Sequence, residues 1–161
     1  MKIIGIDPGT RSTGYGLLDI QKEKTLLLET GTIHPKSKED LPHRIHHIYE
    51  ALADILNEYQ PEILILEKLF AHQSYPMTSS ILGHVRGVIC LLCAQKNLKL
   101  IEESPKRIRK TLTGNGNASK LQTRSMVAHY LRIDEKKLTL DASDALALAL
   151  GYAQMKGRYD F

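Results

Sequence analysis

Hydrophobic residues in the first third of the chain follow the two-residue alternation of β-strands. Ile3, Ile4 and Ile6 are β-branched and fall on both sides of this alternation, which predicts a strand buried on both faces. Residues 13–20 and 25–33 predict two further strands, and the polar connection between them is short enough for a hairpin. We therefore predict three antiparallel strands at the start of the fold.

After residue 40, apolar residues recur at the three- and four-residue steps of amphipathic helices. One helix is predicted over 41–59, and a longer one, from about 75 to 96, is apolar around most of its surface. The remaining pattern predicts strands at 62–67 and 98–101, and helices at 106–112, from 118 or 119 to 131, and from 141 onward. This order predicts an α/β fold: a five-stranded mixed sheet, three antiparallel strands then two parallel, flanked by helices.

Acidic residues stand at the ends of two predicted strands and at the start of the last helix. Asp7 ends the first strand, Glu67 ends the fourth, and Asp141 and Asp144 share one face of the helix. If these two strands are parallel neighbours, their acids emerge at the edge where open α/β sheets place their sites. Three of the acids also have a simpler explanation, since Asp7 suits a turn and Asp141 and Asp144 suit a helix N-terminus.

Four converging carboxylates would repel one another, and oxygen-binding cations such as Mg²⁺ neutralise clusters of this kind. The acids therefore predict a metal site. Two Mg²⁺ ions bridged by carboxylates suit phosphodiester hydrolysis, because one activates the attacking water and the other stabilises the leaving oxygen. This chemistry yields a nuclease hypothesis.

Composition and charge narrow the class of protein. With 161 residues, the chain can bury a core without disulfides, and we expect a single domain over 1–161. No apolar run of 18 residues and no signal-peptide pattern are present, so we expect a cytoplasmic protein without a membrane partner. Residues 96–137 hold 11 basic and 4 acidic side chains, whereas the net charge of the whole chain is +4. This basic excess favours a polyanion such as nucleic acid, with a solvated helical surface as the alternative.

Cysteine and histidine residues are the other candidates for metal chemistry. Cys90 and Cys93 lie in an apolar stretch without further zinc ligands, so we interpret both as core packing. His43, His46 and His47 share one helical turn, but no acid or Cys completes a metal-binding set at suitable spacing. We interpret them as part of a solvated helix face.

Glycines mark two places where another molecule has room to approach. Gly83 and Gly87 are four residues apart on the long helix, so a homodimer contact is a hypothesis there, with internal packing as the alternative. The loop at 113–117, flanked by Arg109 and Lys120, has the freedom to present backbone N–H groups to a phosphate. A plain turn between helices is the alternative.

Five motifs together resemble those of the RuvC-type Holliday junction resolvases. They are GIDPGTRSTGYG near the start, LEKLFAHQ around Glu67, GHVRGVI from Gly83, TGNGNASK from Thr113 and DASDALALAL from Asp141. The resemblance implies a ribonuclease H-like fold, a homodimer, and Mg²⁺- or Mn²⁺-dependent nicking of two strands of like polarity at a four-way DNA junction, in homologous recombination and DNA repair. It also implies cooperation with a branch-migration complex of RuvA- and RuvB-type proteins.

The same resemblance assigns roles to individual residues. The metal-binding catalytic acids of the family match Asp7, Glu67, Asp141 and Asp144. Phe70 matches an aromatic residue that stacks on bases near the junction centre, with burial in the core as the alternative. Arg109 and Lys120 match two basic positions that are commonly both Lys. Because Arg keeps the charge but changes its geometry, Arg109 is expected to contact phosphate and not to transfer protons.

Three other classes of protein share some of these features. A related ribonuclease H-like nuclease that trims ribosomal RNA precursors would share the acids and the fold. Actin-like and Hsp70-like ATP-binding proteins also end their first strand in Asp-x-Gly-Thr, but they enclose a nucleotide between two lobes, for which 161 residues are too few. A non-catalytic junction-binding protein with structural acids is disfavoured, because all four matching acids are present.

Overall fold

The sheet is central to the fold, and its strands come from both halves of the chain. The computed structural model describes residues 1–22, 24–68 and 76–159, with the backbone alone for 76–79 and 158–159. The strands are β1 (Lys2–Asp7), β2 (Thr13–Ile20), β3 (Thr25–Ile33), β4 (Ile63–Glu67) and β5 (Lys99–Glu103), in the order β3-β2-β1-β4-β5. The first three pair antiparallel, whereas β4 is parallel to both β1 and β5. The predicted mixed sheet is confirmed.

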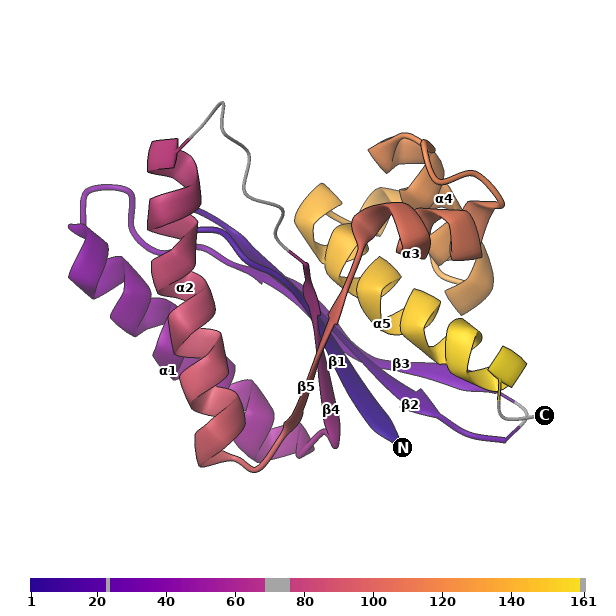
Figure 1. Ribbon diagram of the computed structural model, residues 1–161, viewed down its shortest axis with the longest axis horizontal. Helices are drawn as coiled ribbons and strands as arrows, with labels where there is room; N and C mark the ends of the chain where they lie inside the picture. Colours follow the sequence, from indigo (N-terminus) through magenta and orange to yellow (C-terminus); the bar gives the residue numbers. More distant parts are fainter. Residues whose placement is uncertain (23, 69–75, 160–161) are drawn as a thin grey trace.

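Helices cover both faces of this sheet (Figure 1). One layer consists of α1 (Leu41–Tyr59) and α2 (Pro76–Gln95). The other consists of α3 (Pro105–Thr113), α4 (Lys120–Leu131) and α5 (Leu140–Tyr159), with a short 3₁₀ turn at Glu135–Lys137 before α5. Successive β1 residues enter different cores, since Ile3 packs in the cluster with α5 and Ile4 in the cluster with α1 and α2. This double burial explains the run of isoleucines in β1.

Helix α5 lies directly on the backbone of β1 and β2, because glycines replace side chains at the contacts. A Cβ on Gly5 would lie 2.0 Å from the carbonyl oxygen of Ala145, and one on Gly14 would lie 2.1 Å from that of Asp141. A Cβ on Gly16 would lie 2.5 Å from the side chain of Leu146. These three residues form a glycine cradle that fixes the height of α5 above the sheet. Helix α5 therefore packs closely against the sheet.

Two details of the fold differ from the sequence-based predictions. Cys93 is buried as predicted, but Cys90 is exposed, so its assignment to the core was wrong. This prediction failed because the apolar residues of α2 surround the helix, and such a pattern does not show which side of the helix is exposed. Strand β5 extends two residues beyond the predicted end, because Glu102 and Glu103 still pair with β4.

Among the described helices, none has both the length and the apolarity to cross a membrane.

Candidate active site

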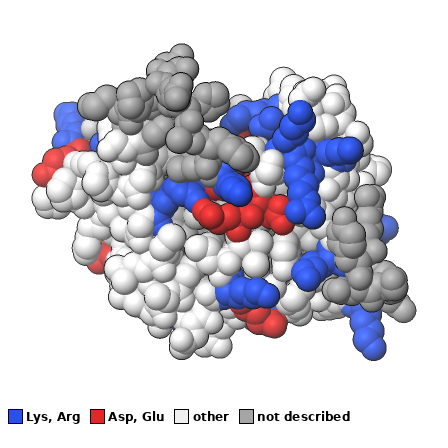
Figure 2. Space-filling model, in the orientation of Figure 1, with Lys and Arg blue, Asp and Glu red and all other residues white. Residues whose placement is uncertain are grey.

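The four predicted acids meet at one edge of the sheet. In the parallel pairing of β1 with β4, Ile6 lies opposite Leu66, so the next residues of the two strands, Asp7 and Glu67, emerge side by side. Asp141 lies in the first turn of α5 and Asp144 three residues later, and the glycine cradle places this helix over β1 and β2. Figure 2 shows acidic side chains gathered at the middle of this face, with Lys and Arg side chains around them.

The simpler explanations for these acids do not fit the local hydrogen bonds. The turn after β1 is closed by Thr13, whose Oγ1 donates to the carbonyl of Gly9 at 2.7 Å. At the start of α5, Thr139 Oγ1 accepts a hydrogen bond from the backbone N–H of Ala142 at 3.2 Å and so caps the helix. Within the described residues, the acids therefore serve neither to close the turn nor to cap α5.

The pKa values of two acids show how strongly the carboxylates interact. Burial, followed by the negative charges of Asp144 and Glu67, raises the pKa of Asp7 from 3.8 to about 7. Burial and the charge of Asp144 also raise the pKa of Glu67, against the opposing charges of Arg109 and Lys120. Buried like charges at this density are costly, so the cluster favours a bound cation.

Two of the acids are engaged by neighbouring side chains. Lys120 forms an ion pair with Asp144, and Ser12 donates a hydrogen bond to Asp141. Burial alone would lower the pKa of Lys120, but its hydrogen bond with Asp144 and the charge of that acid outweigh burial and raise it. Over the described ranges, no three His, Cys, Asp or Glu side chains already converge as a metal cage. The oxygen donors nevertheless fit a hard cation such as Mg²⁺.

The acids line two separate cavities. A cavity of about 620 Å³ contains Asp7 and Asp141, and a smaller one of about 150 Å³ contains Glu67 and Asp144. The smaller cavity is also lined by Arg109 and Lys120, the two predicted basic residues, so the structure brings both of them to the acids. Phe70, the seventh predicted site residue, lies outside the described residues.

Arg86 is a site residue that sequence reasoning missed. Its side chain is only 13% exposed, donates a hydrogen bond to the backbone carbonyl of Glu67 at 2.6 Å and forms an ion pair with Glu102 on β5. The residue thereby ties α2 to the ends of two strands and helps to fix the backbone that carries Glu67. Its position in the GHVRGVI motif was the available signal, as was the position of Ser12 in GIDPGTRSTGYG.

The glycine loop before α4 uses most of its backbone donors in hydrogen bonds of its own. Asn115 N–H donates to Thr113 Oγ1 at 3.1 Å, and Asn117 N–H donates to Asn115 Oδ1 at 2.9 Å. The N–H groups of Gly114 and Ala118 bond to the carbonyls of Lys110 and Asn115. These committed donors favour the plain turn between helices over a phosphate-binding loop.

The three histidines of α1 lie on a solvated face, as predicted. All three are exposed. His43 Nδ1 lies 2.5 Å from Asp40 Oδ1, and this contact raises the pKa of His43. His46 lies 3.4 Å from Glu50.

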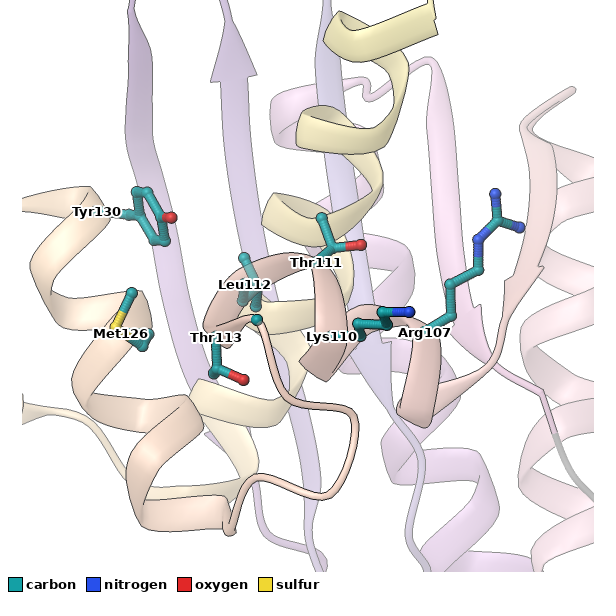
Figure 3. Close-up of a pocket in the computed structure, with 8 residues that line it drawn as sticks. Arg107, Lys110, Thr111, Leu112, Thr113, Met126 and Tyr130 are labelled. Carbon is teal, nitrogen blue, oxygen red and sulfur yellow. The ribbon is translucent and has the colours of Figure 1, made fainter.

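Part of the basic region borders a groove between α3 and α4. This groove, about 580 Å³ in volume, is lined by Arg107 and Lys110 of α3 and by Met126 and Tyr130 of α4, among others (Figure 3). None of the four acids lines it. The groove is therefore separate from the candidate active site.

A comparison with models of protein families identifies the family of this chain. The model described as crossover junction endodeoxyribonuclease RuvC matches residues 3–152. The chain belongs to this family. The RuvC of Chloroherpeton thalassium is 41% identical over 150 residues, which cover 93% of this chain and 80% of that protein. The RuvC of Ehrlichia canis is 38% identical over 159 residues, which cover 99% of this chain and all of that protein.

Solved RuvC structures share the fold. Thermus thermophilus RuvC superposes with a TM-score of 0.87 at 24% identity, covering 99% of this chain and 97% of that one. A second Thermus RuvC structure, in complex with a Holliday junction substrate, has the same TM-score at 21% identity and covers 98% and 96%. The yeast mitochondrial Holliday junction resolvase Ydc2 has a TM-score of 0.70 at 14% identity, with coverage of 98% and 80%. The ribonuclease H-like fold expected from the RuvC motifs is confirmed.

The raised pKa of Asp7 predicts how the stability of the protein in EDTA depends on pH. Asp7 has a pKa of about 7 in the folded protein against 3.8 for the ordinary group, so between these values the folded state holds a proton that unfolding releases. The free energy of unfolding is therefore expected to fall as the pH rises from about 4 to about 7. Denaturant titrations across this range measure the slope. Asp7→Asn should flatten it, and equal slopes for the two proteins would contradict the prediction.

Proposed function

We propose that this chain resolves four-way DNA junctions by metal-dependent, symmetric nicking of two strands of like polarity, in homologous recombination and DNA repair. The observation that carries the proposal is the meeting of four carboxylates at one sheet edge, in a chain of the RuvC family. The Thermus RuvC structure with a Holliday junction substrate supports the same substrate for this chain. The proposal treats residues 1–161 as a single nuclease domain that acts in the cytoplasm.

The metal in this proposal is Mg²⁺, with two ions per active site and Mn²⁺ as a substitute. The residues that would hold it are Asp7, Glu67, Asp141 and Asp144, whose oxygens are the ligands that Mg²⁺ prefers. When bound, the metal supplies an activated water as nucleophile and stabilises the leaving oxygen. The expected products carry a 5′-phosphate and a 3′-hydroxyl.

The chain's own residues orient and balance this cluster. Ser12 holds one oxygen of Asp141 by its hydrogen bond, and Arg86 holds the backbone of Glu67. Arg109 shares the smaller cavity with Glu67, and we assign its guanidinium to a phosphate oxygen of the DNA. Lys120, held in its charged form by Asp144, supplies a second positive charge near the same phosphate.

The proposal also includes a dimer and two kinds of partner contact. Symmetric nicking needs two active sites, and we place the dimer contact on the outer face of α2. Space is open beyond the Cα atoms of Gly83 and Gly87, and Leu91 is 52% exposed on the same helix. Following the RuvC resemblance, we assign Phe70 to stacking on a base at the junction centre. A branch-migration complex of RuvA- and RuvB-type proteins would deliver the junction.

The experiment that tests this function compares four substrates of one sequence. A synthetic four-way DNA junction, linear duplex, single-stranded DNA and the RNA counterpart of the junction are incubated with the protein in Mg²⁺ or in EDTA. The expected result is paired, symmetric nicking of the DNA junction alone, lost in EDTA. Cleavage of linear duplex or RNA at the same rate would contradict junction resolution. Single unpaired nicks would contradict the dimer.

A further inference from the structure

The larger active-site cavity contains two arginines that the catalytic arrangement above does not use. Its lining includes Asp7 and Asp141 together with Arg11 and Arg44, and both Arg109 and Lys120 line the other cavity instead. Arg11 lies in the connection between β1 and β2 and is exposed, whereas Arg44 lies near the start of α1 and is partly buried. The two cavities that share the acids thus each have their own pair of basic residues.

Arg44 has a buried hydrogen-bond donor without an acceptor. Its Nε is inaccessible to solvent and has no hydrogen-bond partner. Among the described residues, no ion pair with an acid holds its guanidinium. Asp40, the nearby acid one turn earlier, is bonded to the backbone N–H and to the ring of His43. A buried unpaired donor on a charged group destabilises a fold, so its presence beside a cavity calls for an explanation, and a bound anion supplies one.

A phosphodiester is the ligand that fits this arginine. The buried Nε is closed to a phosphate in the cavity, but the guanidinium carries four further N–H donors on its two Nη atoms. These donors form a rigid fork that suits phosphate oxygens. The cavity opens beside Asp7 and Asp141, where the proposed function places the scissile phosphate, so the next phosphate of the same strand is the anion within reach. The hydroxyl of Ser12 already donates to Asp141. The positively charged donors in the lining of this cavity are Arg11 and Arg44.

We propose that Arg44, with Arg11 beside it, binds a backbone phosphate that flanks the scissile phosphate on the cleaved strand. The strand would then be held by basic residues in both cavities and cross the four acids between them. Arg44 thereby acts as a substrate-binding residue that sets the register of the strand over the acids. This inference rests on the proposed function for the identity of the nucleic acid, but not for the anion site itself.

The test compares Arg44→Ala and Arg44→Lys with Lys99→Ala as a matched control. Lys99 is exposed and begins β5, so it lies at the sheet edge opposite the acids, and its replacement removes the same charge. Binding of a synthetic four-way DNA junction is measured in EDTA over a range of salt concentrations. Loss of one phosphate contact should weaken binding roughly ten- to hundred-fold and reduce the slope of log affinity against log salt by about 1. Lys99→Ala should change neither quantity.

Two further readouts separate a binding role from a structural one. Arg44→Ala is expected to unfold at the same or a higher temperature than the wild type, because its removal leaves no partner unpaired. Arg44→Lys should keep the salt slope and recover only part of the affinity, since an ammonium lacks the fork. An unchanged salt slope in Arg44→Ala, with or without a lower melting temperature, would overturn the proposal. If the wild type cleaves no junction, the proposed function fails, yet the salt slope still decides whether Arg44 binds phosphate.

Discussion

Asp7→Asn is expected to abolish junction cleavage while leaving junction binding intact. The substitution keeps the size of the side chain but removes a negative charge from the centre of the acid cluster. Because a neutral amide is a poor ligand for Mg²⁺, the cleavage rate should fall roughly 10³-fold or more. Single-turnover cleavage in Mg²⁺ measures this loss, and junction binding in EDTA measures the affinity. The affinity should be equal or higher, since a charge that repels the DNA is gone.

Asp54→Asn is the matched control for this experiment. Asp54 is exposed on α1, and its replacement makes the same chemical change away from the acid cluster. Its cleavage rate should equal that of the wild type. Full cleavage by Asp7→Asn, or an equal loss in both variants, would contradict the assignment of Asp7 to the metal.

Gly14→Ala is expected to damage both stability and activity through a single methyl group. Gly14 pairs with Asp7 across the sheet and lies beneath the carbonyl of Asp141, which the new Cβ would approach to 2.1 Å. The oxygen belongs to the backbone and the Cβ has no rotamer with which to avoid it, so α5 must move away from β2 to relieve the clash. The cost should be about 3 kcal/mol or more of unfolding free energy, measured by denaturant titration. The surviving folded protein should cleave more slowly, because Asp141 moves away from Asp7.

Gly157→Ala, a glycine substitution within α5, provides the comparison. Space is open around a Cβ at Gly157, and alanine favours helix by about 0.5–1 kcal/mol over glycine. This variant should therefore be as stable as the wild type or more stable, with normal cleavage. If Gly14→Ala behaved in the same way, the glycine cradle would not determine the position of α5.

The five strands and the five α-helices of the described residues could all be predicted from periodicity, to within two residues at most ends. The bounds of β2, β3 and α1 agree with the predicted ranges, because alternation and helical spacing are local properties. The meeting of Asp7 with Glu67 was conditional on β1 and β4 being parallel neighbours. Strand order depends on long-range contacts, so no local pattern could establish that condition.

The contacts that complete the site could not be predicted from the sequence either, because they join residues that are far apart in the chain. Ser12 and Asp141 are 129 residues apart in the chain, and Arg86 reaches a backbone carbonyl, which no residue type identifies. The orientation of α2 was also hidden, since an all-round apolar helix has no distinct buried face. The resemblance to RuvC supplied the roles of the acids, but it did not distinguish Arg44 from an ordinary helix residue.

The glycine cradle also bears on how far a sequence of this kind can diverge. Because α5 meets β1 and β2 through backbone atoms at Gly5 and Gly14, the position of Asp141 over Asp7 depends little on the shape of the surrounding core side chains. Substitutions in either core can accumulate while the catalytic geometry stays fixed, so long as the glycines remain. On this view, two RuvC chains that differ at three quarters of their positions can retain nearly the same backbone, as this chain and Thermus RuvC do.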